Sequence, residues 1–381
     1  GAVDVLDKRT DQVYPGLNVF EDSGDAGDEY DYSPVEDEPI LTAGAAARVV
    51  VEEPGPYIGS LRVEIPWEIP AALNPGRKRR SRDRVALNIV THVTLAVDTP
   101  YVAICTELDN TARDHRLRAL FPTGAKVDHV FARGQFDVIR RAARPNAAGE
   151  WFQPPAPVAP HQGFVGASDG ARGLAVVTRG LPEYECLKGA SGEATIAVTL
   201  LRCVGWLSRN DLITRKGYAG PPIPVPGAQC PGKYGFEYAV IPHAGSWSEA
   251  GISRAARRFI SPLLAYLASK HTGDLPTEAS LLEADSGAVM ASAVKKTEDG
   301  DGLVVRLCNP GDRPVAIRLV AGVPVGRAYL ADLEEKPMKS LMISDTGRAV
   351  QVDLGAKEIG TVILSLGTPS HSREGDEIPL S

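Results

Sequence analysis

Apolar residues along this chain occur in short runs rich in Val, Ile and Thr, and Gly, Pro, Asn or Asp separate one run from the next. In the run 85–97, Val85, Leu87 and Ile89 share one parity, which is the period of a strand with one buried face. Similar runs cover residues 49–51, 58–65, 101–108, 117–121, 127–131, 136–139, 164–167, 173–178, 195–203 and 236–242. Because no helical segments alternate with them, the pattern predicts a mainly β protein with antiparallel sheets packed as a large sandwich.

One segment has a helical period instead. An S-x-x-E capping box at Ser246–Glu249 precedes Ile252 and Phe259, which are apolar and lie at helical spacing. The pattern predicts one short helix at about 248–260, and Pro262 ends it.

A polar stretch then interrupts the pattern before strand-like runs return, which predicts a second, smaller antiparallel sandwich. We therefore expect an acidic, loop-rich lead-in at 1–46, a large β-sandwich domain at 47–271, a linker at 272–286, a small β-sandwich domain at 287–367 and a frayed tail at 368–381.

The composition is that of a soluble globular protein, with 43% hydrophobic and 23% charged residues. No apolar run approaches the length of a membrane span, which argues against a membrane partner. The net charge of −7 is concentrated in residues 1–38, which hold 12 acidic and 2 basic side chains, whereas the rest holds 36 acidic and 39 basic ones. A near-neutral body behind an acidic first segment argues against a nucleic-acid partner.

The cysteines are five, an odd number, and show no C-x-x-C spacing. They predict neither a disulfide framework nor a zinc knuckle, and they favour a reducing, cytoplasmic setting. The seven histidines are dispersed and none stands at metal-chelating spacing from another ligand, so we assign no metal ligands.

The acidic segment near the N-terminus invites a calcium-loop interpretation, since Asp22, Asp25 and Asp28 alternate with Gly24 and Gly27. The spacing does not match the helix-flanked calcium loop. We favour a Gly/Asp loop held by hydrogen bonds between its side chains and its backbone.

Two charged clusters have catalytic and structural interpretations. For Asp114–Arg118 (DHRLR) we predict an ion-pair network that anchors a sandwich edge, in preference to a catalytic His115. Glu183 and Glu185 share one strand face, so they cannot flank a scissile glycosidic bond as an acid and a nucleophile.

Two aromatic residues, Trp151 and Phe152, open a Pro-rich segment that reads as a surface crossing. We expect their rings to pack beneath this crossing, with stacking on a sugar ring as the alternative.

Five segments together resemble the C-terminal β-rich region of glycoside hydrolase family 38, the α-mannosidases. They follow in order EDSGDAGDEYDYSP (21–34), DNTARDHRLRALFPTG (109–124), SDGARGLAVVTRGLPEYE (168–185), LLRCVGWLSRNDLITRKGYAGPPIPVPGAQCPG (200–232) and SAVKKTEDGDGLVVRLCNP (292–310).

The resemblance implies a supersandwich of the galactose-mutarotase type in an enzyme that hydrolyses α-mannosides with retention, by means of a carboxylate nucleophile and a zinc ion. Nothing in this chain resembles the N-terminal catalytic domain of the family, and it has no His-x-Asp metal motif. We therefore carry over neither nucleophile nor zinc ligands, and expect the chain to be a C-terminal portion, inactive by itself. Its expected partners are an α-mannoside or mannose-containing oligosaccharide and the catalytic domain of the same polypeptide, and a homo-oligomer is left open.

The resemblance also implies substrate-contacting residues. Tyr30 matches a tyrosine that contacts sugar, and Arg215 is the best match to an arginine that holds it, with Asp211 as the expected local partner of Arg215. Arg209 is the rival to Arg215. We expect Arg215→Ala to lower turnover with folding intact, while the structural alternative, in which Arg215 pairs with a carboxylate and stiffens the loop, has equal weight.

The second hypothesis is a stand-alone carbohydrate-binding or structural β-sandwich module, since a fold does not fix a function. Sugar-binding faces display exposed Trp or Tyr, and this chain has only 6% aromatic residues and four Trp. The composition therefore favours the enzyme-portion hypothesis.

Overall fold

The computed structural model describes residues 1–274, 276–300 and 302–367, and contacts divide the chain into two units. The first unit comprises Gly1–Gly134 and Ile139–Pro262, and the second comprises Gln135–Val138 and the described part of Leu263–Ser381. The change of unit after Pro262 precedes the expected linker at 272–286, and no pattern along the chain indicated that 135–138 would group with the second unit.

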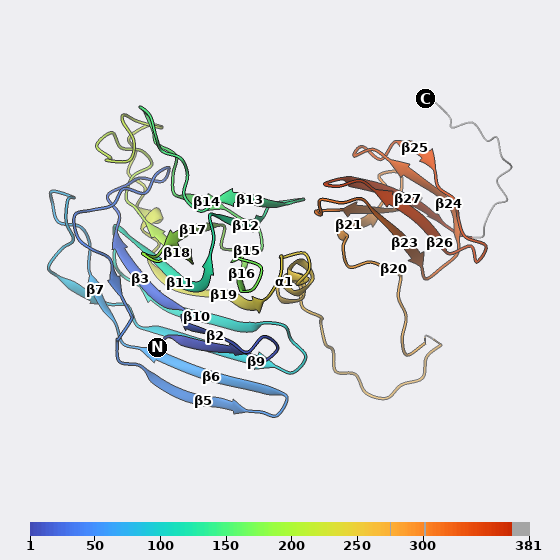
Figure 1. Ribbon diagram of the computed structural model, residues 1–381, viewed down its shortest axis with the longest axis horizontal. Helices are drawn as coiled ribbons and strands as arrows, with labels where there is room; N and C mark the ends of the chain where they lie inside the picture. The colour runs from blue at the N-terminus through green and yellow to red at the C-terminus, as the bar shows by residue number, and fades with distance from the viewer. Residues whose placement is uncertain (275, 301, 368–381) are drawn as a thin grey trace. The chain divides into compact units, whose positions relative to one another are not determined.

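Two large antiparallel sheets form the body of the first unit (Figure 1). The larger has nine strands, in the order β13 (Val138–Ala142), β12 (His129–Arg133), β15 (Phe164–Ser168), β16 (Gly173–Arg179), β19 (Gly232–His243), β10 (Val102–Asn110), β9 (Ile89–Ala96), β6 (Ile58–Ile65) and β5 (Arg48–Pro54). The other has six, in the order β14 (Val158–Pro160), β17 (Glu183–Lys188), β18 (Glu193–Cys203), β11 (His115–Lys126), β3 (Val19–Gly24) and β4 (Ile40–Leu41). Smaller elements are the pairs β1 (Val3–Asp7) with β2 (Gln12–Leu17) and β7 (Glu68–Pro70) with β8 (Arg84–Ala86), the 3-10 turn η1 (Pro226–Gln229) and the helix α1 (Ile252–Ile260).

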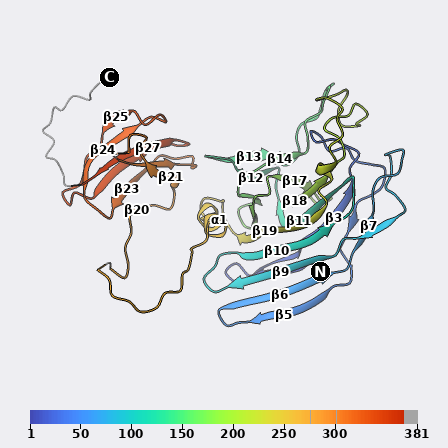
Figure 2. The same cartoon turned by 180° about the vertical axis from the view of Figure 1, so that it is seen from behind.

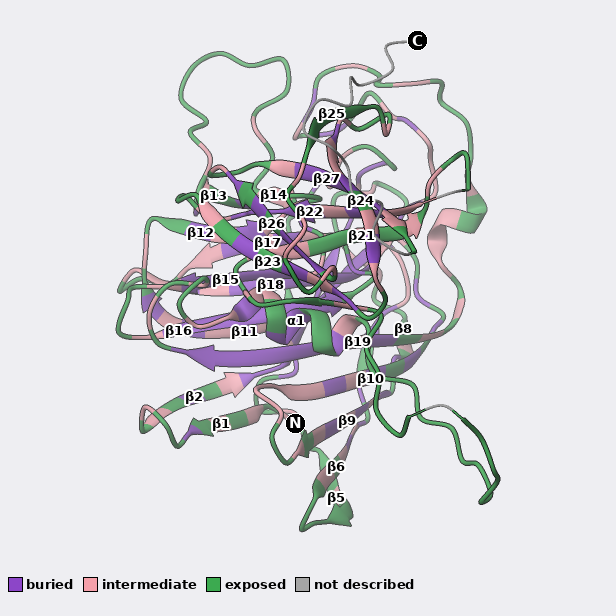
Figure 3. Ribbon diagram, turned by 90° about the vertical axis from the view of Figure 1, so that its right-hand side faces the viewer, coloured by how far each residue is buried: buried purple, intermediate pink, exposed green. Residues whose placement is uncertain are grey.

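The core of the first unit collects the inward-facing residues of its strands. β10 shows the expected period, because Ile104, Thr106 and Leu108 are buried and the residues between them are more exposed. At the centre, the fully buried Tyr238 meets Phe121 edge to face with ring centroids 5.7 Å apart. β16, β11 and β19 are buried along most of their length, whereas β5 is exposed along nearly all of its length (Figure 3).

The second unit is a smaller antiparallel sandwich with its own core, to which Val305, Leu319 and Val352 belong. Its five-stranded sheet has the order β21 (Met290–Lys296), β22 (Leu303–Cys308), β27 (Ile359–Leu366), β24 (Val325–Ala331) and β25 (Pro337–Ser340). Its three-stranded sheet has the order β20 (Leu282–Ala284), β23 (Val315–Ala321) and β26 (Ala349–Leu354). The predicted tail 368–381 lies outside the described residues.

The predicted fold class is confirmed: the described residues are mainly β, in several antiparallel sheets, with a single α-helix. With nine residues, α1 is far shorter than a bilayer-spanning helix, so no described helix could cross a membrane.

The interpretation of 1–46 as a loop-rich lead-in was wrong for its first half. It forms β1, β2 and β3, and Tyr14, Leu17 and Phe20 are fully buried in the core.

The acidic residues of β3 are buried because basic side chains neutralise them. Arg118 forms an ion pair with Glu21, and Arg80 forms one with Asp22. Local composition does not show such pairing.

The helix begins later than predicted, at Ile252 rather than 248. The capping box does form, since the backbone N–H of Ser246 donates to Glu249 Oε2 (2.8 Å) and that of Glu249 to Ser246 Oγ (3.2 Å). It closes a separate turn, however, because Gly251 follows in the left-handed conformation (φ 65°) and redirects the chain before the helix.

A buried histidine makes the stability of the first unit depend on pH. His161 is 2% exposed and packs edge to face against Tyr184, at 5.7 Å between ring centroids. Burial lowers the pKa of His161 from 6.5 to about 4. The unfolded chain therefore binds one more proton between those two values, so the contribution of His161 is present above pH 6.5 and is lost as the pH falls to about 4.

We expect His161→Phe, which keeps an aromatic ring, to reduce the loss of unfolding free energy between pH 7 and 4 by roughly 3 kcal/mol. Urea unfolding followed by Trp fluorescence measures this loss for the first unit alone, since all four Trp lie before residue 263. His271→Phe, at an exposed position, is the matched control and should behave as the wild type. Identical pH dependence in wild type and His161→Phe would contradict this account.

Candidate functional site

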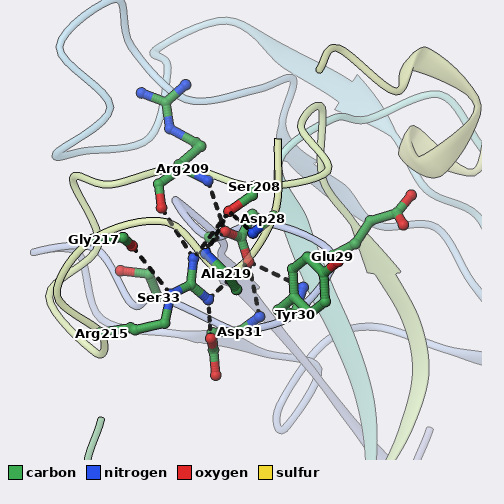
Figure 4. A network of polar contacts seen from close by, with 12 residues as sticks. Asp28, Glu29, Tyr30, Asp31, Ser33, Ser208, Arg209, Arg215, Gly217 and Ala219 are labelled. Atoms are coloured by element: carbon green, nitrogen blue, oxygen red, sulfur yellow. Dashed lines mark hydrogen bonds and ion pairs between the residues drawn. The ribbon is translucent and has the colours of Figure 1, made fainter. Parts of the chain in front are cut away.

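The candidate site is built by two loops that leave the six-stranded sheet at the same end. β3 and β18 both pair antiparallel with β11, so that His115 lies opposite Gly24 on one side and Cys203 on the other. The two strands therefore end level with each other. The segments that follow them, 25–33 and 204–220, meet in the network of Figure 4.

Side chains of the first loop organise its own backbone. Asp25 Oδ1 accepts a hydrogen bond from the N–H of Gly27 (2.8 Å), and Asp28 Oδ1 accepts from those of Tyr30 and Asp31 (3.0 Å each). Gly27 has no room for a side chain, since a Cβ there would lie 2.0 Å from the carbonyl oxygen of Asp31. The prediction of a Gly/Asp loop held by hydrogen bonds between side chains and backbone is confirmed.

Arg215 fastens the second loop to the first (Figure 4). Its guanidinium forms ion pairs with the carboxylates of Asp28 and Asp31, and it also donates to the carbonyl oxygens of Arg209 (3.0 Å) and Gly217 (3.3 Å). The Arg215 side chain is only 3% exposed, and each of its three nitrogens donates to an acceptor of this chain. These contacts match the alternative in which Arg215 pairs with a carboxylate and stiffens the loop. A direct contact between Arg215 and a sugar stays a prediction.

Asp28 is the carboxylate that both loops share. Its Oδ2 accepts the backbone N–H of Arg209 at 2.8 Å as well as the guanidinium of Arg215. Burial acts to raise the pKa of the Asp28 carboxyl, but the hydrogen bonds from Arg215, Arg209 and Asp31 outweigh burial and hold this pKa below its ordinary value. Asp28 therefore stays ionised and anchors the loops.

Arg202, from β18, binds the first loop through both a side chain and the backbone. Its Nε donates to Asp25 Oδ2 at 2.8 Å, and its Nη2 donates to the carbonyl oxygen of Asp31 at 2.6 Å. Burial raises the pKa of the Asp25 carboxyl, although Arg202 opposes that change. Arg202 and Arg215 therefore impose one arrangement on the backbone of this loop.

Asp211 has a different partner from the one predicted. We expected Arg215, but both Asp211 oxygens accept from Arg209, at 2.8 and 2.6 Å, which lowers the pKa of the Asp211 carboxyl. The planar guanidinium of Arg209 meets the carboxylate at two points over a spacing of two residues. Arg215 is directed towards Asp28 instead. Arg209 also lies over the Trp206 ring, 5.3 Å from its centroid.

Tyr30 is an accessible residue of the predicted site, with 54% of its surface exposed. Asp28 fixes its backbone N–H. Its ring lies against Gly220, where an added Cβ would stand 2.9 Å from the phenol oxygen. The glycine therefore permits the close approach that sets the position of this ring.

Phe152 and Tyr218 are exposed beside the same loops, at 65% and 52%. The chain around Phe152 is joined to the site at two points. Gln153 Nε2 donates to Asp31 Oδ1 (2.6 Å), and the backbone N–H of Lys216 donates to the carbonyl oxygen of Phe152 (3.2 Å). The second bond joins backbone to backbone, so this link between the two segments does not depend on their side chains.

The expectation that Trp151 and Phe152 pack beneath the Pro-rich crossing was wrong. Trp151 is 47% exposed, and Phe152 is more exposed still. Pro154 and Pro157 of the crossing are themselves exposed. The segment therefore lies at the surface and does not cover these rings.

His115 belongs to a buried ion-pair network, as predicted. It is fully buried with Nδ1 2.6 Å from Asp22 Oδ2, and Arg118 forms ion pairs with Glu21 and Glu185. The network is not at a sandwich edge, however, because β11 lies between β3 and β18 inside the sheet. A buried charge on a central strand is stable only if a neighbouring strand supplies an opposite charge. Glu21 of β3 lies opposite Arg118 of β11 and supplies it.

The donor set of the site does not fit a metal ion. Its carboxylates, Asp25, Asp28 and Asp31, are already held by Arg202 and Arg215. Throughout residues 1–274, 276–300 and 302–367, no group of three or more His, Cys, Asp or Glu is placed to hold a metal.

Sequence reasoning did not assign to Asp28, Asp31 or Ser208 a role in joining the two loops. Ser208 Oγ accepts the N–H groups of Ala219 (2.9 Å) and Gly220 (3.1 Å) and so closes the second loop. Asp28 and Asp31 lie within a segment that carries the family resemblance, which was the available signal. Their partner arginine is 187 residues from Asp28, so local spacing could not reveal the pairing.

The first unit is a large β sandwich and the second a smaller one, which is the architecture that the family resemblance implies. A model described as the glycosyl hydrolases family 38 C-terminal domain matches residues 2–208, and one described as the family 38 C-terminal beta sandwich domain matches residues 288–362. The chain belongs to glycoside hydrolase family 38, as the sequence motifs indicated.

Similar proteins include a putative mannosylglycerate hydrolase of Halalkalibacterium halodurans, 28% identical over 377 residues, or 95% of this chain and 40% of that protein. The human alpha-mannosidase 2C1 is 27% identical over 283 residues, 73% of this chain and 24% of that protein. An alpha-mannosidase from Enterococcus faecalis V583 has a crystal structure similar to this one, with a TM-score of 0.81 and 29% identity over 95% of this chain and 40% of that one. This chain therefore spans well under half the length of these relatives.

Replacing Arg215 should destabilise the first unit, contrary to the expectation that folding would stay intact. Arg215→Ala would leave Asp28 buried without its charge partner, which is expected to lower the unfolding free energy by about 3–5 kcal/mol. The matched control is Arg209→Ala, whose partner Asp211 is half exposed, and its loss should stay below about 1 kcal/mol. Urea unfolding followed by Trp fluorescence measures the unfolding free energy of both variants. Equal losses of unfolding free energy would contradict the role of Arg215 in fastening the second loop to the first.

Proposed function

We propose that this chain is the C-terminal portion of an enzyme that hydrolyses α-mannosides, and that it completes the sugar-binding cleft. The family membership and the names of the relatives support the substrate class. The observation that carries the role of this portion is the exposed Tyr30, held on a loop that Arg202 and Arg215 fasten to the sheet.

Tyr30 suits a sugar contact for chemical reasons. A phenol offers a flat apolar face for a pyranose ring and one hydroxyl for a hydrogen bond. Its loop has little freedom left, so the ring is placed before a substrate arrives and less entropy is lost on binding. Phe152 and Tyr218 are further exposed aromatic residues, on the second loop and on the segment joined to it.

Bond cleavage is assigned to another part of the longer polypeptide. Glycoside hydrolysis uses two carboxyl groups on opposite sides of the scissile bond, whereas Asp28 is held by Arg215 and Glu185 by Arg118. A zinc ion and a retaining mechanism are proposed for that other part alone, since the donor set described here does not fit zinc. The chain described here orients the sugar.

A cytoplasmic setting is part of the proposal, and its support is the spacing of the five cysteines along the chain. Cys186 and Cys203 are buried, as small core residues are. Burial raises the pKa of the Cys186 thiol to about 11, so this thiol stays protonated and unreactive.

The second candidate is a carbohydrate-binding module without hydrolytic function. The exposed aromatic group of Tyr30, Phe152 and Tyr218 favours it more than the composition suggested. Titration of the 381-residue chain with a mannose-containing oligosaccharide, followed by calorimetry, distinguishes the two. Tight binding by this chain alone would support the module, and weak or absent binding would support a cleft completed by two parts.

The direct test is hydrolysis of an aryl α-mannoside, with zinc supplied, by this chain alone and by the chain joined to the segment encoded upstream of it. We expect activity only for the joined protein. Turnover by the isolated chain would overturn the proposal, because a complete site would then lie within these sandwiches.

In the joined protein, Tyr30→Phe should lower kcat/KM about three- to tenfold, since it removes one hydrogen bond. Tyr30→Ala also removes the ring face and should cost about ten- to hundredfold. Tyr266→Ala, at an 86% exposed tyrosine of the second unit, is the control and should leave kcat/KM unchanged. A Tyr30→Ala enzyme with wild-type kcat/KM would remove Tyr30 from the cleft.

A further inference from the structure

β5 is the terminal strand of the nine-stranded sheet, and within the described residues no strand pairs with its outer side. It is the outermost strand of the sheet in both views (Figures 1 and 2). Val49 and Val51 are 57% and 61% exposed. An edge strand presents a row of backbone N–H and C=O groups that are ready to pair with another strand.

The devices that prevent such pairing lie at the ends of this edge, not at its centre. Arg48–Glu52 reads RVVVE, with three consecutive valines and neither lysine nor proline. Pro54 comes only at the last position of the strand. One β-bulge follows Val51, so the straight part of the edge is the part that carries the valines.

One face of this edge is apolar. Val49 and Val51 lie opposite Val63 and Leu61 of β6, and Leu61 lies opposite Val93 of β9. Val63 and Val93 are buried, whereas Leu61 is 40% exposed. The face that forms the core elsewhere thus continues outwards to the edge without a cover.

The opposite face of the edge carries charge. Arg48 Nη1 lies 3.6 Å from Glu64 Oε2, and Glu52 Oε2 lies 2.8 Å from His92 Nδ1. Arg48 and Glu52 therefore share a face and stand two residues either side of Val50.

We propose that β5 pairs antiparallel with β5 of a second copy of this chain, about a two-fold axis at Val50. In that register each Val49 lies opposite Val51 of the partner. Each Arg48 then approaches Glu52 of the partner, the residue at the bulge, on the same face. When two β5 strands pair antiparallel, the Arg48 of one meets the Glu52 of the other, whereas a parallel arrangement would set like charges opposite each other. The partner strand that fits these charges is therefore β5 of a second copy. The uncovered apolar rows of the two copies then adjoin across the axis.

The test is the mass of the 381-residue chain by sedimentation equilibrium at micromolar concentration. The wild type should give about 81 kDa, twice the 40.5 kDa of one chain. Val51→Lys places a charge in the apolar row and Arg48→Glu sets like charges opposite each other, so each should weaken association at least tenfold. The double variant Arg48→Glu with Glu52→Arg restores the complementarity and should restore the dimer.

Val294→Lys is the matched control, because Val294 is 49% exposed on β21, an edge strand of the second unit. It should leave the dimer intact, and circular dichroism should confirm that every variant is folded. A monomeric wild type would overturn the proposal and leave the edge to solvent or to another partner. A dimer that survives Val51→Lys, or one that only Val294→Lys dissociates, would also overturn it.

Discussion

The structure around the candidate site depends on buried pairs between arginines and carboxylates. β3 brings Glu21 and Asp22 into the sheet, and the loop after it adds Asp25 and Asp28, all of them buried. Removing such charges from water is unfavourable unless each one meets an opposite charge and further hydrogen bonds. The required partners come from distant parts of the chain, namely Arg80, Arg118, Arg202 and Arg215. These pairs therefore bind the N-terminal segment to the body of the sandwich.

This neutralisation also decides what the site can do chemically. A carboxylate with its oxygens occupied by arginine and backbone N–H groups, such as Asp28, cannot serve as a proton donor or nucleophile without losing the loop. The accessible groups include the aromatic ring and hydroxyl of Tyr30, and the carboxylates of Glu29 and Asp211 are exposed as well. The proposed role is recognition, for which the hydrogen-bonded loop would hold Tyr30 in one orientation.

The two large sheets of the first unit have nine and six strands, and β5 at the end of the larger sheet is exposed on both faces. The first unit does not bury β5, so core packing does not account for the valines of this strand. The alternation of Val49 and Val51 with the charged Arg48 and Glu52 side chains gives this edge two distinct faces. The symmetric arrangement of Arg48 and Glu52 about Val50 is given by the sequence. That β5 is free to pair with another strand follows from its terminal place in the sheet.

Local features of the chain were sufficient to predict the β character, the single short helix and the family, because strand periodicity, helical spacing and the five family motifs each lie within a short segment. The Gly/Asp loop was predictable for the same reason, since its hydrogen bonds span only a few residues. The three-dimensional arrangement was needed to show which arginine meets which carboxylate, that 1–24 forms core strands, and that Arg215 is buried while Tyr30 is exposed. Ion pairing and burial depend on residues far apart in the chain, such as Asp28 and Arg215, and the register of β3 and β18 against β11 brings these two together.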